Sequence, residues 1–328
     1  MPEIPGVARD VLVGLLVSGD EGRAQDMVQA LVERGASPPM VISDLLGPAM
    51  ATVGQQWQDG HVSIAQEHRA TAIAEGILHC VLADVPRPRS GHRVWLTGVE
   101  GEWHTLPARL VTGVWQCLGW EVVSLTPSLP ADDLRDLAAA DTTTMAGVSC
   151  SLAANLVPAW ETISALRASG FRVIAGGRAF EVVAGMAAIL GADAHFHDPI
   201  AASDTLARWS ELSSTPPRDP TRWASWLQVR DVWLGLPALV EDATWVAREL
   251  HDVALSDDVL RVDLTLLART AVAAALSSRP ELLTTHLRWY ASLLDPAHDD
   301  RAVTSTLISC IERVLPPGDV VREVLAAC

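Results

Sequence analysis

The first 85 residues carry apolar positions at the spacing of amphipathic helices. Turn-forming stretches at 18–20, 35–39 and 59–60 divide them into four segments. The predicted helices are 7–17, 24–31, 41–57 and 64–82. Helices joined by such short connections are typical of an antiparallel bundle, so we predict a four-helix bundle over residues 1–85.

The pattern changes after a Pro- and Arg-rich stretch at 86–91, which we interpret as a linker. Short apolar runs, which predict strands, then alternate with helical periodicity. The predicted strands are 93–98, 121–126, 145–149, 172–175 and 194–197, and the predicted helices run up to 118 and over 131–140, 156–169 and 180–190. This alternation predicts an α/β domain over residues 91–208, built on a doubly wound, Rossmann-like parallel sheet.

A Ser- and Pro-rich stretch at 213–217 marks a second predicted boundary. Beyond it only helical periodicity remains, and we predict an all-helical domain over residues 218–328. Its predicted helices are 226–234, 236–253, 257–277, 280–294 and 301–314. The predicted fold class is therefore α/β plus all-α.

Composition narrows the classes of function. The chain is 49% apolar and 20% charged, which is typical of a globular protein, and its net charge is −16. Because a surface with this much negative charge repels phosphate backbones, we expect no nucleic-acid partner. No apolar run approaches the roughly 20 residues of a membrane span. The five cysteines are scattered and odd in number, which favours reduced thiols and a cytoplasmic location.

The loop after the first predicted strand carries the clearest candidate chemistry. It places Glu102 two residues before His104 at the carboxyl end of a strand, where ligands of doubly wound sheets bind. Imidazole is a common metal ligand, and a carboxylate on its other nitrogen fixes the tautomer. A histidine on a loop can also be a plain surface residue. Small residues end two further strands, where they open a slot for a ligand or serve only tight helix–sheet packing.

These segments resemble the cobalamin-binding domain of methionine synthase and its relatives. The matching segments are Glu102-Trp103-His104-Thr105-Leu106-Pro107, Ser149-Cys150-Ser151 and Gly176-Gly177. The resemblance implies a base-off cofactor with His104 as the lower cobalt ligand. It also assigns cofactor contacts to Glu102, Trp103, Ser149, Ser151, Gly176 and Gly177. Three positions depart from the family pattern: Glu102 replaces Asp, Pro107 replaces Gly and Ser151 replaces Leu.

The bundle carries a second motif, in which nine residues separate Trp57 from Glu67-His68. This spacing resembles the CarH-type cobalamin photoreceptors. The resemblance implies adenosylcobalamin as the cofactor, with Trp57 and Glu67 lining the adenosyl pocket. It further implies that His68 takes the upper cobalt position after photolysis. The motif can instead be a core tryptophan and ordinary cap chemistry at a helix start.

The C-terminal segment adds aromatic and cationic residues. The chain has twelve Trp but three Phe and one Tyr, and helix 280–294 combines His286, Arg288, Trp289 and Tyr290. A CarH-like half followed by a helical domain resembles the photocobilins, which implies biliverdin as a second chromophore. We assign its propionates to Arg269 and Arg288, and its pyrroles to His286 and Tyr290. A docking or dimerisation bundle would use the same residue types.

The sequence therefore predicts a light-sensing photoreceptor and not an enzyme. We expect a homo-oligomer with light-dependent assembly, a possible separate output protein and no membrane partner. One alternative is a corrinoid protein that shuttles methyl groups between methyltransferases. Another is a light-independent cobalamin sensor.

Overall fold

The computed structural model describes residues 4, 6–86, 92–212, 221–251, 255–293 and 300–327. Apart from Pro86, the predicted linkers 86–91 and 213–217 lie outside the described residues. No helix in the described part of the chain combines the length and the apolarity that a bilayer crossing needs.

The N-terminal residues form the predicted helix bundle, with one departure. Its helices are α1 (Gly6–Ser18), α2 (Glu21–Glu33), α3 (Pro38–Met40), the π-helix η1 (Val41–Leu46), α4 (Gly47–Gln58) and α5 (Ile64–Leu82). The helix predicted at 41–57 is confirmed from Gly47 onward and is wrong over Val41–Leu46, which is π-helical. Pro48 explains the change, since proline has no N–H to bond four residues back and its ring clashes with that carbonyl. The N–H of Gly47 accordingly bonds Ile42, five residues back.

The middle of the chain confirms the predicted doubly wound parallel sheet. Its strands are β1 (Arg93–Thr97), β2 (Glu121–Leu125), β3 (Met145–Ser149), β4 (Arg172–Gly176) and β5 (Ala194–His195). They lie in the order β2-β1-β3-β4-β5, and all neighbours are parallel. Successive strands are added on one side of β1 up to β2 and on the other side from β3 onward. The loops after β1 and β3 therefore border the crevice where such folds bind ligands.

Helices cover both faces of the sheet. One face is covered by α6 (Thr105–Cys117) and α10 (Pro199–Ser210), and the other by α7 (Ala131–Ala139) and α8 (Leu156–Ala168). Short elements follow β3 and β4, namely η2 (Ala153–Asn155), η3 (Arg178–Phe180) and α9 (Met186–Ile189). The helix predicted at 180–190 is wrong over its first half, because Gly185 adopts φ +78° and starts the short α9. Helix α10 was not predicted.

The C-terminal segment is all-helical, as predicted. It comprises α11 (Thr221–Leu234), α12 (Leu236–His251), α13 (Asp257–Ser277), α14 (Glu281–Leu293), α15 (Asp300–Val314) and α16 (Val320–Ala326), of which α16 was not predicted. Helix α13 lies at the centre, because it contacts each of the other five and buries most of its residues. It also packs against α8 and η2 of the α/β domain.

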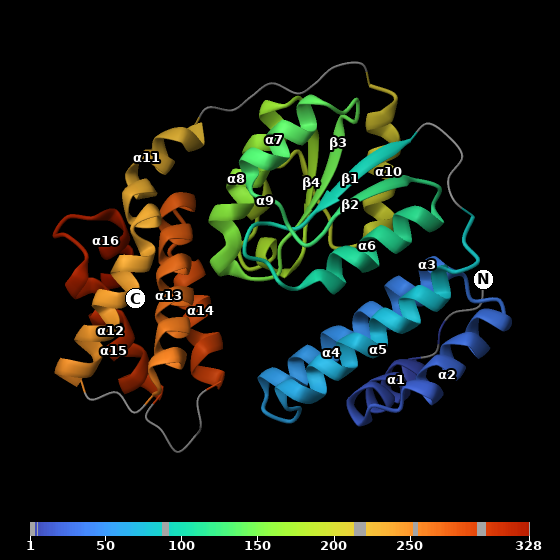
Figure 1. Cartoon of the computed structure of the whole chain (residues 1–328), viewed down its shortest axis with the longest axis horizontal. Helices are drawn as coiled ribbons and strands as arrows, with labels where there is room; N and C mark the ends of the chain where they lie inside the picture. The colour runs from blue at the N-terminus through green and yellow to red at the C-terminus, as the bar shows by residue number, and fades with distance from the viewer. Residues whose placement is uncertain are drawn as a thin grey trace.

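Two hydrophobic cores lie on opposite faces of the sheet. Side chains alternate along β1, so that Val94 and Leu96 join the core shared with the bundle, whereas Trp95 joins the core shared with the C-terminal helices. The bundle packs on α6, and the C-terminal helices pack on α8, where the rings of Trp160 and Trp226 lie 4.9 Å apart. The α/β domain is thus held between two helical domains, as Figure 1 shows.

Gly147 on β3 lies in the interior of the sheet, where a larger side chain has little room. A methyl group there would lie 2.7 Å from both Leu96 Cδ1 and Trp115 Cη2. We expect Gly147→Ala to lower the free energy of unfolding by about 1–3 kcal/mol, because both neighbours are buried and cannot move freely. In α1, Gly14→Ala meets no atom within 4 Å and should instead stabilise by about 0.5–1 kcal/mol. Chemical denaturation of both variants tests this, and equal effects would contradict it.

Candidate functional site

His104 and Glu102 form a close pair in the loop between β1 and α6. The Nδ1 atom of His104 lies 2.5 Å from Oε1 of Glu102, and the same oxygen accepts the backbone N–H of His104 at 3.1 Å. Because Nδ1 is engaged, Nε2 is the ring nitrogen left for a metal. The side chain of His104 is 54% exposed, whereas that of Glu102 is 3% exposed. The imidazole is therefore fixed from behind and open in front.

Glu102 also binds the loop after β3. Its Oε2 accepts the backbone N–H of Ser151 at 2.8 Å and of Leu152 at 3.3 Å, and the side-chain amide of Asn155 at 3.3 Å. One buried carboxylate thus ties together the two loops that border the crevice of the sheet. Leu152 and Asn155 were not predicted from the sequence. Leu152 contributes only its backbone N–H, which every residue except proline has, and Asn155 belongs to none of the motifs in the sequence.

The charges of the pair follow from these contacts. Burial alone would raise the pKa of the Glu102 carboxyl, but the hydrogen bonds from His104 and Ser151 hold that pKa below its usual range. The hydrogen bond to Glu102 raises the pKa of His104, against the opposing effect of burial. Glu102 therefore stays ionised at neutral pH and can hold the Nδ1 proton of His104.

Pro107, which departs from the family pattern, causes no loss of hydrogen bonding. It is the third residue of α6, for which His104 occupies the N-cap position. The first N–H groups of a helix have no acceptor within it, so a proline there removes no helical bond. The loop and the start of α6 accommodate this residue without distortion of the pair.

The small residues after β3 and β4 lie at the same edge of the sheet. Gly177 has φ +103°, and a Cβ atom there would lie 2.4 Å from the carbonyl oxygen of Cys150. Gly176 accepts the N–H of Cys150 at 3.1 Å, so the two loops run in close contact. Ser149 is buried and Ser151 is partly buried between them. Tight packing of these backbones therefore requires Gly177, whether or not a ligand lies above it.

Two of the three residues predicted in the bundle, Glu67 and His68, are in contact with each other. Trp57 is near the end of α4, and Glu67 and His68 are in the first turn and a half of α5. Glu67 Oε2 lies 2.7 Å from His68 Nδ1, and Glu67 Oε1 accepts the hydroxyl of Thr71 at 2.9 Å. The imidazole of His68 is 72% exposed.

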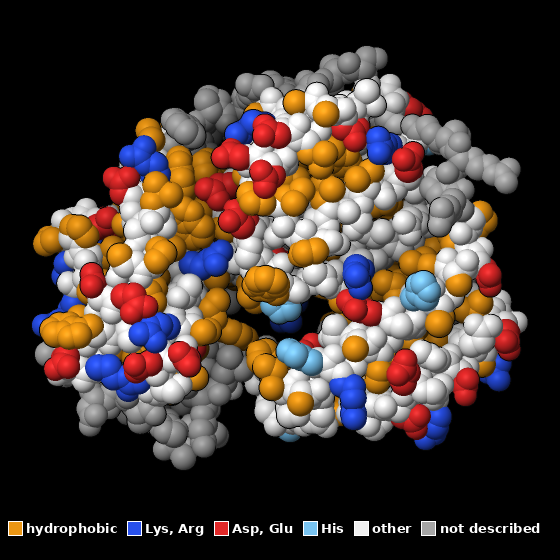
Figure 2. All heavy atoms as spheres, in the orientation of Figure 1, with side chains coloured by type: hydrophobic (Ala, Val, Ile, Leu, Met, Phe, Trp, Pro, Cys, Tyr) orange, Lys and Arg blue, Asp and Glu red, His pale blue; other side chains and the backbone are white. Residues whose placement is uncertain are grey.

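The carboxylate of Glu67 also acts on His104, whose pKa it helps to raise. The α5 residue is therefore close enough to the loop of the α/β domain to act on its imidazole. Figure 2 shows a hollow near the middle of the molecule with histidines on both sides. Trp103 is 84% exposed, an unusual state for an indole in a folded chain. Arg178, which directly follows Gly177, lowers the pKa of His104, and the sequence analysis did not identify it.

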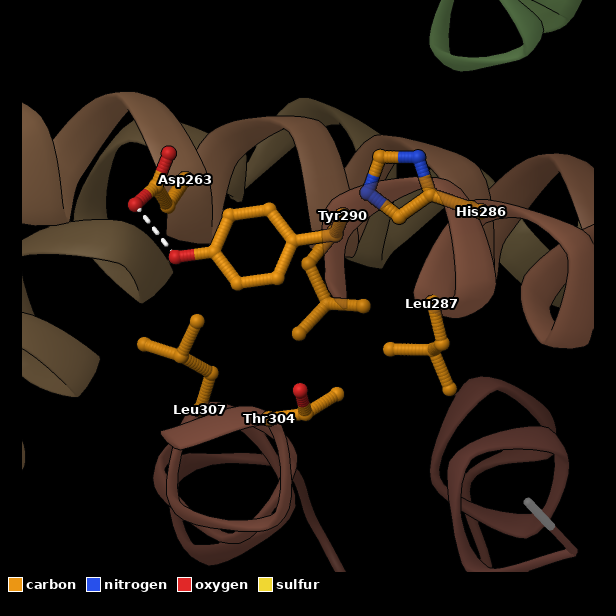
Figure 3. A pocket seen from close by; sticks show the side chains of 7 residues that line it. Asp263, His286, Leu287, Tyr290, Thr304 and Leu307 are labelled. Atoms are coloured by element: carbon orange, nitrogen blue, oxygen red, sulfur yellow. Dashed lines mark hydrogen bonds between the residues drawn. The ribbon is translucent and has the colours of Figure 1, made fainter. Parts of the chain in front are cut away.

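The residues predicted to hold biliverdin are only partly brought together. Tyr290 donates its hydroxyl to Asp263 at 2.6 Å, and His286 lies beside it over a small cavity between α13, α14 and α15 (Figure 3). Burial lowers the pKa of His286 to about 4, so this imidazole is neutral. Arg288 is exposed, and Arg269 does not line the cavity.

That cavity measures about 10 Å³, room for about one water molecule. A tetrapyrrole is many times larger and would require α14 and α15 to separate. Biliverdin binding therefore stays a prediction from the sequence.

Known proteins that resemble this chain include corrinoid and B12-binding proteins, in agreement with the site predicted between the bundle and the α/β domain. Residues 8–81 match the family described as B12 binding domain. The methanol–corrinoid protein of Methanosarcina barkeri (strain Fusaro / DSM 804) is 27% identical over 120 residues, 36% of this chain and 46% of that protein. The HTH-type transcriptional repressor CarH of Myxococcus xanthus is 27% identical over 127 residues, 38% of this chain and 42% of that protein. The matched regions span less than half of either relative.

Among solved structures, the Methanosarcina barkeri monomethylamine corrinoid protein is similar in fold. It aligns with a TM-score of 0.54 at 17% identity and covers 62% of this chain and 98% of its own. The bundle and the α/β domain thus share the fold of a known corrinoid protein. Together with the family match over residues 8–81, this makes cobalamin or a related corrinoid the class of cofactor that the findings support.

Proposed function

We propose that the chain is a light sensor that uses adenosylcobalamin, bound base-off with His104 as the lower cobalt ligand. The observation that carries the proposal is the His104–Glu102 pair at the crevice of the sheet, close enough to the bundle for Glu67 to act on His104. When bound, the cofactor would supply the photochemistry, which is the breaking of a carbon–cobalt bond by light, and the chain would supply the pocket and the ligands.

The residues of the chain would hold and orient this cofactor. Glu102 keeps His104 in the tautomer with a free Nε2, and its bonds to the loop after β3 fix the ring against the sheet. Trp57 and Glu67 would border the upper side. Gly177 lets the backbone after β4 lie close to that after β3.

His68 would provide the change between dark and illuminated forms. It is the most exposed member of the bundle motif, and its partner Glu67 can hold Nδ1 just as Glu102 does for His104. If His68 bound the cobalt after loss of the adenosyl group, the bundle would be drawn toward the sheet. We propose that this two-state arrangement, and no catalysed reaction, is the output, passed on through a homo-oligomer or a separate partner.

A second candidate is a corrinoid protein that carries methyl groups between methyltransferases. The similarity to the methanol–corrinoid protein favours it, at the same 27% identity as the similarity to CarH. A methyl carrier uses the lower histidine but has no need of His68. The two candidates therefore differ in what His68 does.

The lower ligand is tested by His104→Ala. We expect bound cobalamin to lose the spectrum of histidine-ligated cobalt and its affinity to fall at least about tenfold, or about 1.4 kcal/mol. His79→Ala, at the exposed end of α5, serves as the control. Spectral titration of both variants gives the answer, and a His104→Ala spectrum equal to that of the unchanged chain would refute the assignment.

The pairing itself is tested by Glu102→Gln in the chain without cofactor. We expect NMR titration to place the pKa of His104 above about 6.5, and to find a lower pKa in Glu102→Gln, because the carboxylate that favours the imidazolium is gone. The stability that the ionised pair contributes through His104 is present below about pH 6.5 and is lost as the pH rises through the folded-state pKa. An unchanged His104 pKa would show that Glu102 does not act on the ring.

The sensor and the methyl carrier are separated by His68→Ala. Under green light, we expect the adenosylcobalamin complex of the unchanged chain to give a stable product with two histidine ligands. His68→Ala should still lose the adenosyl group, but its product should bind water and release cofactor faster. Absorption spectra and size-exclusion chromatography before and after illumination measure both steps. Identical products from the two chains would favour the methyl carrier.

A further inference from the structure

Arg269 reaches out of the C-terminal helices into the α/β domain. It lies on α13, and its Nε donates to the carbonyl oxygen of Ala154 in η2 at 3.2 Å. Its Cζ lies 5.2 Å from the ring centre of Trp233 on α11, so the guanidinium is held between an indole and the loop after β3. A Cβ atom added to Gly101 would lie 3.4 Å from two of its nitrogens, which places it beside the loop after β1 as well.

This position is costly for a cation. Burial lowers the pKa of Arg269, although a guanidinium stays charged. Cys150, Glu100, Glu102 and Glu161 act on it from the α/β domain, yet none of the ion pairs found among the described residues includes it. A half-buried charge without a paired carboxylate has a desolvation cost, which the hydrogen bond to Ala154 and the ring of Trp233 must offset. The residue therefore needs another reason to be there.

The carbonyl group that accepts from Arg269 belongs to a segment that Glu102 also binds. Glu102 holds the segment 151–155 through the N–H groups of Ser151 and Leu152 and the amide of Asn155. Arg269 holds the same segment through the carbonyl of Ala154. The contacts thus run without a break from the ring of His104 to α13, by way of one five-residue segment.

We propose that Arg269 is a positioning residue that joins the C-terminal helices to the His104 loop, so that binding of cobalamin at His104 changes the stability of α13. This inference rests on the cofactor binding of the proposed function but not on light, since binding alone is the event that α13 detects. A contiguous set of contacts becomes a coupling only when a change at one end is measured at the other, and the experiment therefore measures both ends.

The test compares the unchanged chain with Arg269→Met, Arg269→Lys and the control Arg230→Ala. Methionine keeps the apolar volume of the side chain and its contact with Trp233 but removes the charge and the donors. Lysine keeps the charge. Arg230 is on α11 and pairs with its neighbour Asp231 at 3.0 Å, so it serves as an arginine of the same domain outside the contact. Each full-length chain is titrated with hydroxocobalamin in the dark, and amide hydrogen exchange of residues 257–277 is measured with and without it.

We expect cobalamin to slow exchange in α13 by about tenfold in the unchanged chain and in Arg230→Ala. In Arg269→Met that response should disappear, the histidine-ligated spectrum should weaken and the affinity should fall about tenfold, with partial recovery in Arg269→Lys. A residue that only fills space would leave spectrum and response intact in Arg269→Met, and this result would overturn the proposal. If circular dichroism shows that Arg269→Met does not fold, Arg269→Ala carries the same comparison.

Exchange in the chain without cofactor separates this inference from the proposed function. Loss of Arg269 should speed exchange of the Ser151 and Leu152 amides, because the segment that presents them to Glu102 is no longer held from the other side. Were these amides to exchange as in the unchanged chain, Arg269 would not position the loop. Were they to speed up while no chain binds cobalamin, the contact would stand and the cofactor assignment would fail.

Discussion

The arrangement of the site depends on one buried carboxylate. Glu102 accepts from His104 with one oxygen and from Ser151, Leu152 and Asn155 with the other, and so meets the cost of taking a charge out of water. A neutral side chain of similar shape would satisfy fewer of these donors. The loops after β1 and β3 meet only because this acceptor lies between them, and the exposed imidazole has a defined direction only because the loops meet.

The sheet relates this site to the rest of the chain. Because strand side chains alternate, one face of β1 belongs to the core of the bundle and the other to the core of the C-terminal helices. The two helical domains are thereby placed on opposite sides of the sheet that carries the His104 loop. A direct hydrogen bond between them, from Gln58 on α4 to Ser292 on α14 at 3.4 Å, adds to this link. A change in how the bundle sits would have a short path to the C-terminal helices.

Much of this was accessible from the sequence, because periodicity and turn residues are local signals. They identified the class of fold and all five strands of the sheet. The two-residue spacing of Glu102 and His104 after the first strand indicated their pairing. The π-helix at Val41–Leu46 was missed because the effect of Pro48 falls on the preceding turn, which reads as ordinary helix. Asn155 and Arg178 were missed because their roles depend on which loops meet, and that is set by the order of the strands. Composition suggested that Arg269 binds a chromophore within its own domain. In the structure its side chain instead contacts the α/β domain, because α13 packs against η2.

The contact between the tilted rings of Trp160 and Trp226 has a consequence for how this chain can be divided. Trp160 belongs to α8, but its ring contacts that of Trp226 on α11. Trp160 and its apolar neighbours share one core with side chains beyond residue 220. Ending the chain near residue 212 would leave this indole and its apolar neighbours in water on the outer face of α8. Such a fragment would tend to self-associate through that face. Any oligomer it formed would report on the missing helices and not on the intact protein.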